Sequence, residues 1–281
     1  MLRMLLMGSA AGAGAVAYVR HSSRRFEEMV SAEVAMIAES ARRLPPSEVT
    51  EDGLAALPQV VAAYLAKAGV NEAHKPRFTR LRHGGEFRPA PDRPWMRIRG
   101  EEYISADPPA FLWYGTVSPF PGLSIRARDK YASGGGAMLV KLNSVYAIAD
   151  QRGKEMDEAS LARWLSELFW LPGALAGPRV NWNGLDDKSA RASIEHMGTS
   201  ASLDFSFGED GLPASVSGLR HRSVKDGYKE TPWGGRCRMF EDVEGLMLPK
   251  QVEAFWEIDG EESPYVRFEV TDIEFDVFER Y

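Results

Sequence analysis

From about Arg77 onward, apolar residues recur at every second position, a period that fits strands and does not fit helices. The clearest case is the segment Ser200–Phe207. Its inward-pointing set is Ala201, Leu203, Phe205 and Phe207, and polar residues occupy the positions between them. A strand of this kind has one apolar face and one solvated face, as in antiparallel sheets with one covered side. This alternation constrains the fold more than any other feature of the chain.

Turn signals separate the alternating segments. Asp210-Gly211 and Asp259-Gly260 are Asp-Gly pairs, which mark hairpins because glycine takes a positive φ without steric cost. Near Thr271-Asp272 the apolar phase changes, which predicts a bulge. Roughly ten short strands result, joined by hairpin-length turns in an antiparallel meander. Besides those named, we expect strands at Phe78–Phe87, Trp95–Ile104, Phe111–Val117, Leu123–Arg128, Met138–Leu142, Val180–Leu185, Ala190–Met197, Arg236–Glu241, Val252–Ile258 and Val266–Val277.

One stretch inside the strand region, Asp157–Leu175, has a helical period instead. Its apolar stripe consists of Leu161, Trp164, Leu165, Leu168 and Phe169, whereas Arg163, Ser166 and Glu167 fall on the other side. Asp157 or Ser160 can cap the start, and Pro172-Gly173 cannot continue the helix. Because a meander with one wet face must cover the other, we expect this helix to lie across the apolar face.

The predicted fold class is therefore α+β: a strongly curved antiparallel sheet, or half-barrel, with a helix across its concave face. Two further helices are expected near the N-terminus, at Arg24–Leu44 and Pro58–Ala68, with Gly69 closing the second in a left-handed conformation. We expect one domain over residues 23–281, because all-β domains often reach about 200–250 residues undivided.

Residues 1–22 are expected to form a membrane anchor or signal segment. Met4–Val19 is uncharged and rich in Ala and Gly, and at about 1.5 Å per residue it is marginal for a hydrocarbon core of about 30 Å. Ala15-Val16-Ala17 suits a signal peptidase, whereas the basic residues after Val19 suit an uncleaved anchor held by the positive-inside rule. The sequence thus predicts membrane association and leaves the side of the membrane open.

The net charge of −6 and the pI near 5.5 argue against a nucleic-acid partner, which demands a concentrated basic surface. Catalytic and cofactor motifs are also missing from the sequence, and the histidines have no metal-ligand spacing, so no metal and no cofactor are expected. An enzyme would have to use Cys237, the single cysteine, or His196 or His221, which lie on neighbouring strand candidates. Paired carboxylates such as Asp186-Asp187 fall in predicted turns.

Large aromatic residues are the remaining feature. If the sheet curves and the helix bridges it without filling it, these residues line a dry cavity suited to an acyl chain or another apolar molecule. In a flat sheet the same residues are ordinary core. The candidate ligand contacts are Trp113, Leu161, Trp164, Leu165, Leu168, Phe169, Trp170, Phe205, Phe207, Trp256 and Phe268.

A succession of motifs also resembles a known family. The motifs are LPQVVAAYLAKAGV (Leu57–Val70), RDKYASGGGAMLVKL (Arg128–Leu142), ELFWLPGAL (Glu167–Leu175), LDDKSARASI (Leu185–Ile194) and TPWGGRCRMFEDVEGLMLPKQVEAFW (Thr231–Trp256). In this order they resemble a family of uncharacterised bacterial proteins. That family is similar in fold to the periplasmic lipoprotein-sorting carriers and their outer-membrane receptor, whose half-barrel and helical lid enclose acyl chains. The resemblance transfers no catalytic residue. Together with the segment Met4–Val19, it leads us to expect a membrane-associated protein of the bacterial cell envelope.

Three readings follow. The first is a membrane-associated protein that binds a lipid or other apolar ligand between the sheet and the helix, without chemistry. The second is an enzyme that acts on a small lipophilic substrate in the same cavity. The third is a structural envelope protein whose helix simply fills the core. The sequence does not indicate a protein partner.

Overall fold

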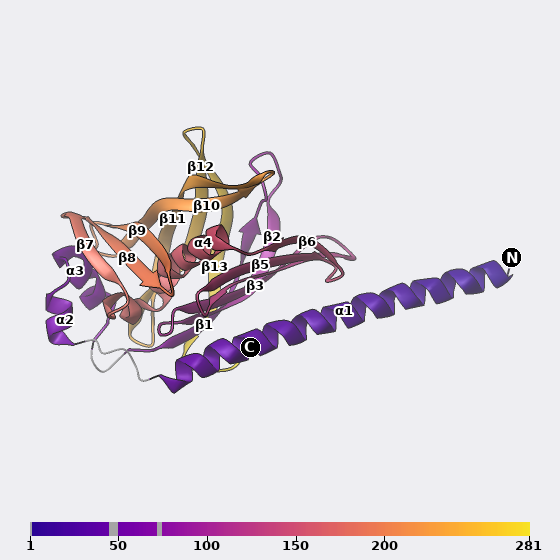
Figure 1. The fold of residues 1–281 in the computed structure, drawn as a ribbon, viewed down its shortest axis with the longest axis horizontal. Helices are drawn as coiled ribbons and strands as arrows, with labels where there is room; N and C mark the ends of the chain where they lie inside the picture. The colour runs from indigo at the N-terminus through magenta and orange to yellow at the C-terminus, as the bar shows by residue number, and fades with distance from the viewer. Residues whose placement is uncertain (1, 45–49, 72–74) are drawn as a thin grey trace.

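A computed structural model describes residues 2–44, 50–71 and 75–281 and shows one curved antiparallel sheet of 13 strands (Figure 1). The spatial order is β6-β5-β4-β3-β2-β1-β13-β12-β11-β10-β9-β8-β7. The strands are β1 (Phe78–Phe87), β2 (Met96–Ser105), β3 (Ala110–Phe120), β4 (Leu123–Ala132), β5 (Gly135–Leu142), β6 (Tyr146–Gln151), β7 (Asn181–Asp186), β8 (Ser189–His196), β9 (Thr199–Phe207), β10 (Pro213–Val224), β11 (Gly227–Val243), β12 (Leu246–Ile258) and β13 (Glu261–Phe275).

The sheet does not close into a barrel, because its edges, β6 and β7, are not paired with each other. Every pairing joins strands that are consecutive in sequence except one, in which β1 pairs with β13 and joins the first half of the meander to the last. Helix α4 (Lys154–Glu167) connects β6 to β7 and thus runs from one edge of the sheet to the other. It contacts β4 and β5 on one side and β9 and β10 on the other, inside the curve (Figure 1).

The structure confirms the antiparallel meander and refines its count from roughly ten strands to 13. Strand β6 had no counterpart in the prediction. The predicted bulge is present: Arg82 pairs with Asp272 and His83 with Val270, so Thr271 is the extra residue of β13. Both Asp-Gly turns also join the strands expected, with Gly211 at φ 74° and Gly260 at φ 81°.

The central helix differs from the prediction at both ends. It begins at Lys154 after Gly153, and Asp157 caps nothing within it; the Asp157 carboxylate instead accepts a hydrogen bond from the Gly136 N–H at 2.6 Å. The α-helix ends at Glu167, and the segment predicted to continue it forms two 3₁₀ turns, η1 (Leu168–Trp170) and η2 (Pro172–Ala176). These tighter turns keep Leu168, Phe169 and Trp170 buried while the chain bends toward β7.

Three helices precede the sheet. The predicted helix Arg24–Leu44 is the second half of a longer helix, α1 (Leu2–Arg43). The predicted helix Pro58–Ala68 corresponds to α3 (Gln59–Lys67), and Gly69 follows it at φ 82°, as expected. The short helix α2 (Glu51–Ala55), capped by the Thr50 hydroxyl, was not predicted. Among the described residues, no helix is long and apolar enough to cross a membrane. The role of Met4–Val19, which lies within α1, stays a prediction.

The second half of α1 covers the outer face of the sheet near β1–β5, whereas its first half extends beyond the sheet (Figure 1). Phe26, Val30, Val34 and Ile37 belong to a second core with Phe78, Tyr103 and Leu112, separate from the core inside the curve. The expectation of one wet face is therefore wrong for these strands, because the second half of α1 is amphipathic and buries its apolar stripe there.

Candidate functional site

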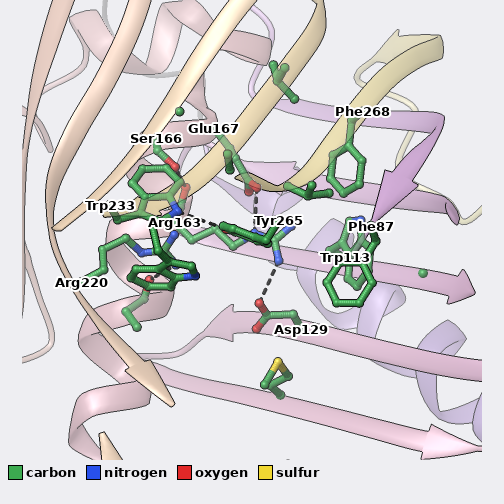
Figure 2. Close-up of a pocket in the computed structure, with 18 of the residues that line it drawn as sticks. Phe87, Trp113, Asp129, Arg163, Ser166, Glu167, Arg220, Trp233, Tyr265 and Phe268 are labelled. Atoms are coloured by element: carbon green, nitrogen blue, oxygen red, sulfur yellow. Dashed lines mark hydrogen bonds and ion pairs between the residues drawn. The ribbon is translucent and has the colours of Figure 1, made fainter. Parts of the chain in front are cut away.

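A cavity of about 360 Å³ lies between α4 and the concave face of the sheet. Its walls come from β1–β6 on one side, β10–β13 on the other, and α4 with η1. The volume falls within the range of about 300–1,000 Å³ typical of small-molecule pockets. Figure 2 shows ten of the lining residues by name.

The wall formed by the sheet is mainly apolar. Ala127, Val252 and Ala254 line the cavity from the concave face and are only partly buried, although they also pack against the core. Trp256 and Phe268 are likewise apolar, partly exposed and on this wall. The structure therefore leaves apolar surface uncovered inside the fold, where core side chains are ordinarily close-packed.

The predicted ligand contacts divide into two groups. Those that line the cavity are Trp113, Phe169, Trp170, Trp256 and Phe268. Those that are buried in the core instead, outside the cavity lining, are Leu161, Trp164, Leu165, Leu168, Phe205 and Phe207. Trp164 is fully buried and its Nε1 donates to the Ser105 carbonyl at 2.8 Å, while Phe169 packs edge-on against Phe205 with ring centroids 5.1 Å apart.

The polar face of α4 is therefore the one that points toward the cavity. The sequence prediction had placed this face away from the core. Arg163, Ser166 and Glu167 line the cavity, together with Met156 and Ala159. The reason is geometric: the helix lies inside a curved sheet, so both of its faces are enclosed. Its apolar stripe packs at one end of the concave side, and its polar face becomes a wall of the cavity.

Arg163 organises that polar wall. Its Nε donates to Glu167 at 2.7 Å, Nη1 to Asp129 at 2.8 Å and Nη2 to Glu102 at 3.0 Å. The guanidinium also lies over the Phe111 ring, 4.8 Å from its centroid. Burial alone would lower the pKa of Arg163, but the three carboxyl groups outweigh that effect and hold this pKa well above its ordinary value.

Glu102 is the carboxyl group most affected by this environment. Its side chain is fully buried, and burial, followed by the nearby charge of Glu167, raises its pKa well above the ordinary value. A protonated Glu102 can donate a hydrogen bond to Glu167 while its other oxygen accepts from Arg163. The cluster then contains one cation and two carboxylates, from Asp129 and Glu167.

His83 supports the cavity from behind Trp113. The Trp113 Nε1 donates to His83 Nε2 at 2.8 Å, and His83 Nδ1 lies 3.3 Å from the Gly84 carbonyl, which fixes a neutral ring with its proton on Nδ1. Burial lowers the pKa of His83 to about 4, and the Arg163 charge acts in the same direction. This neutral histidine holds the Trp113 ring in place against Phe268, with ring centroids 6.2 Å apart.

The three residues considered for catalysis do not come together. Cys237 lines the cavity, but burial raises the pKa of its thiol, so a thiolate is disfavoured. His196 on β8 binds the Tyr131 hydroxyl at 2.9 Å, whereas His221 on β10 pairs with Glu158 at 2.9 Å, and β9 separates their strands. The described residues contain no group of three or more side chains that could hold a metal ion.

Sequence reasoning missed the polar residues of the site: Asp129, Arg163, Glu167 and Arg220. A signal was present in the strands. Asp129 continues the apolar phase of Ile125 and Ala127, and Arg220 shares its phase with Val216, so both are charged residues at inward-facing positions. A charge in the inward phase of a half-buried strand indicates a buried partner or an enclosed space.

The chain belongs to a family of unknown function, DUF6544, which matches residues 47–268. No curated protein matches the sequence. Among solved structures, the chain is similar to a LolA superfamily protein from Nitrosomonas europaea, with 13% identity and a TM-score of 0.39, over 76% of this chain and 93% of that one. It is also similar to a beta-barrel-like protein of the DUF1849 domain from Brucella abortus, with 11% identity and a TM-score of 0.23, over 72% and 98% of the two chains. The resemblance to an uncharacterised family that was predicted from the sequence is confirmed.

Proposed function

We propose that this DUF6544 member binds an apolar small molecule or a lipid acyl chain in the cavity, by burial and without chemistry. The observation that carries the proposal is the uncovered apolar wall. Ala127, Val252, Ala254, Trp256 and Phe268 are only partly buried, and all of them line the cavity. A ligand that covers them removes apolar surface from water, which is the main source of affinity in sites of this kind.

The free energy available from burial of an alkyl chain sets a limit on the affinity. Each methylene group transferred from water contributes about 0.8 kcal/mol, so a chain of about ten methylenes contributes roughly 8 kcal/mol before costs. Association costs at least about 4 kcal/mol in lost freedom, and ordering of the chain adds to this cost. At most about 4 kcal/mol then remains, so the expected dissociation constant is about millimolar or weaker for a purely aliphatic ligand of this length.

The test combines native mass spectrometry of the purified protein with titration of Nile red, a neutral apolar dye. Ala254→Phe places a ring among Gly235, Val252 and Val266 and is expected to weaken dye binding at least tenfold by filling the cavity. Ala214→Phe, at an exposed position of β10, is the matched control and should bind like the wild type. A wild-type protein that carries no ligand and takes up no dye would refute the proposal and favour a filled core.

We also propose that the N-terminal segment associates with a bacterial membrane. Val16 and Tyr18 on α1 are exposed, and so are Phe120 and Tyr146 on the sheet. Val19 and Ser23 share a surface hollow with Phe120, so the apolar residues of the β3–β4 turn lie beside α1. These contacts support a surface that meets the lipid where α1 leaves the domain.

Flotation of the full chain with vesicles of phosphatidylethanolamine and phosphatidylglycerol tests this second proposal. Phe120→Ser is expected to reduce the bound fraction, whereas Met239→Ser, a similarly exposed position on β11, should leave it unchanged. Absence of wild-type binding to the vesicles would refute it. N-terminal sequencing of the protein from cells separates a signal peptide from an uncleaved anchor.

A further inference from the structure

We infer that the cavity selects amphiphiles with an anionic head, a carboxylate or a phosphate monoester, and that Arg220 binds the head. This inference rests on the proposed binding function and specifies the class of ligand. It is carried by the contrast between the arginines that line the cavity.

Two of these arginines already have carboxylate partners. Arg163 binds Glu167, Asp129 and Glu102, and Arg236 pairs with Glu253 and Glu262. Their positive charges are neutralised within the protein. Neither is available to a ligand without first losing an existing ion pair.

Arg220 differs, because among the described residues no carboxylate lies within ion-pair distance of its guanidinium. Its Nη2 donates to the Ala159 carbonyl at 2.9 Å, and its Nε is buried with no hydrogen-bond partner among those residues. The guanidinium lies over the Trp233 ring, 4.5 Å from the centroid, which fixes its position (Figure 2). Arg222, two residues along the same face of β10, also lines the cavity, and no described residue forms a hydrogen bond with its buried Nε.

A partly buried guanidinium without an ion-pair partner is an expensive arrangement, because its desolvation is not offset by a carboxylate in direct contact. The same burial lowers the pKa of Arg220, although arginine stays charged at neutral pH. Arg220 and Arg222 place two guanidinium groups at the polar end of the cavity, and neither forms an ion pair with a carboxylate of the described residues. The polar end of the cavity thus favours an anion.

Tyr265 supplies a second donor. Its hydroxyl oxygen accepts from Trp233 Nε1 at 3.1 Å, so its own hydrogen remains available to a ligand. Tyr265 lines the cavity and stands beside Trp233 in Figure 2. A carboxylate or phosphate placed between Arg220 and Tyr265 would receive charge-assisted hydrogen bonds, and its alkyl chain would then extend along the wall of Ala254, Val252 and Phe268.

The test measures displacement of Nile red by four probes: dodecanoate, dodecyl phosphate, 1-dodecanol and inorganic phosphate. Wild-type protein should bind at least one of the two anionic amphiphiles roughly tenfold or more tightly than the alcohol of equal chain length, since a hydrogen bond to a charged group contributes that much. Comparison of the two identifies the preferred head. Inorganic phosphate should not displace the dye, because it lacks the chain.

Arg220→Met should abolish the preference for the anionic probes while leaving 1-dodecanol binding within about twofold, since the apolar wall is unchanged. Tyr265→Phe should reduce the preference severalfold. Arg191→Met, which removes an exposed arginine of β8 paired with Asp204, is the control and should keep the wild-type preference. Thermal unfolding of each variant verifies that it is folded.

The possible failures are distinct. If the dye and 1-dodecanol bind but the anionic amphiphiles have no advantage, or if Arg220→Met retains that advantage, the inference about the head group is wrong and the proposed function stands. If no probe binds the wild type, both are wrong. Displacement of the dye by inorganic phosphate would indicate an anion site without a role for the chain and would also overturn the inference.

Discussion

Replacement of Glu102 by glutamine is expected to change how the stability of the protein depends on pH. Glu102 is fully buried beside Arg163, and burial together with the Glu167 charge holds its folded-state pKa well above the ordinary value of 4.5. The unfolded chain releases this proton near the ordinary value, whereas the folded protein keeps it. Stability from this group is therefore complete at low pH and is lost as pH rises toward the folded-state pKa, at about 1.4 kcal/mol per pH unit.

The glutamine side chain reproduces the protonated acid without titrating. Its carbonyl oxygen can accept from Arg163 Nη2, as Glu102 Oε1 does at 3.0 Å, and its amide can donate to Glu167. The free energy of unfolding of Glu102→Gln should therefore match the wild type near pH 4.5 and exceed it by about 1.4 kcal/mol for each further pH unit, until the folded-state pKa is reached.

The difference between the two proteins is more informative than the wild-type profile. His83 titrates in the opposite sense: its folded-state pKa of about 4 lies below the ordinary 6.5, so stability is lost as pH falls through that range. The two groups offset each other in the wild type where their ranges overlap. Subtraction of one profile from the other removes the His83 contribution, because both proteins contain it.

Urea unfolding followed by tryptophan fluorescence, from about pH 5 to about pH 8, measures this difference. Glu209→Gln, an exposed carboxylate in the β9–β10 turn, is the control and should give a profile parallel to the wild type. A constant offset between Glu102→Gln and the wild type, or a deficit that grows with pH, would show that Glu102 is ionised in the folded protein and would refute the assignment.

Three further perturbations test the same region. Arg163→Met leaves Glu102, Asp129 and Glu167 buried without their cation and should cost about 3–5 kcal/mol of unfolding free energy at neutral pH, against less than about 1 kcal/mol for the exposed Arg191→Met. The wild type should lose about 3 kcal/mol of unfolding free energy as pH falls from 6.5 to about 4, and His83→Phe should remove this loss. The variant also leaves the Trp113 N–H without a partner, which should cost about 1–3 kcal/mol of unfolding free energy at all pH values. If the loss at acid pH is unchanged in the variant, His83 is not the neutral histidine assigned above. Gly136→Ala places a methyl group 2.4 Å from the Met156 carbonyl oxygen and 2.6 Å from Ser160 Oγ. Helix α4 must then move away from β5, which should lower the unfolding free energy by about 1–3 kcal/mol. Gly84→Ala is the control in the same denaturation assay, because no atom lies within 4 Å of the added methyl group.

Local signals were sufficient for the strands and most of their turns. The alternation that predicted Ser200–Phe207 gave β9 almost to the residue, and the phase change at Thr271-Asp272 marked a real bulge. The pairing of β1 with β13 could not be predicted in this way, because alternation fixes the face of each side chain and not the identity of a distant partner strand. The outer core under α1 was missed for a related reason: its residues have the outward phase of their own strands.

The candidate site was predicted only in part. Trp113, Phe169, Trp170, Trp256 and Phe268 line the cavity because they are large and lie on inward-facing or helix-end positions. The polar wall was missed because a helical period separates two faces without saying which environment each one meets. Arg163 on an isolated amphipathic helix belongs to the solvated side, and only the enclosing sheet makes that side part of the interior.

The polar face of α4 also explains why the cavity is open. An apolar helix face could pack closely on Ala127, Val252 and Ala254, but Arg163 and Glu167 cannot do so without burying polar atoms that have no partners. Two donors of the cavity lining already lack hydrogen-bond partners among the described residues, Arg220 Nε and Arg222 Nε. A purely aliphatic occupant would leave both unsatisfied, whereas an anionic amphiphile can cover the apolar wall with its chain and bind Arg220, beside α4, with its head. The two walls therefore favour the same ligand class from opposite sides.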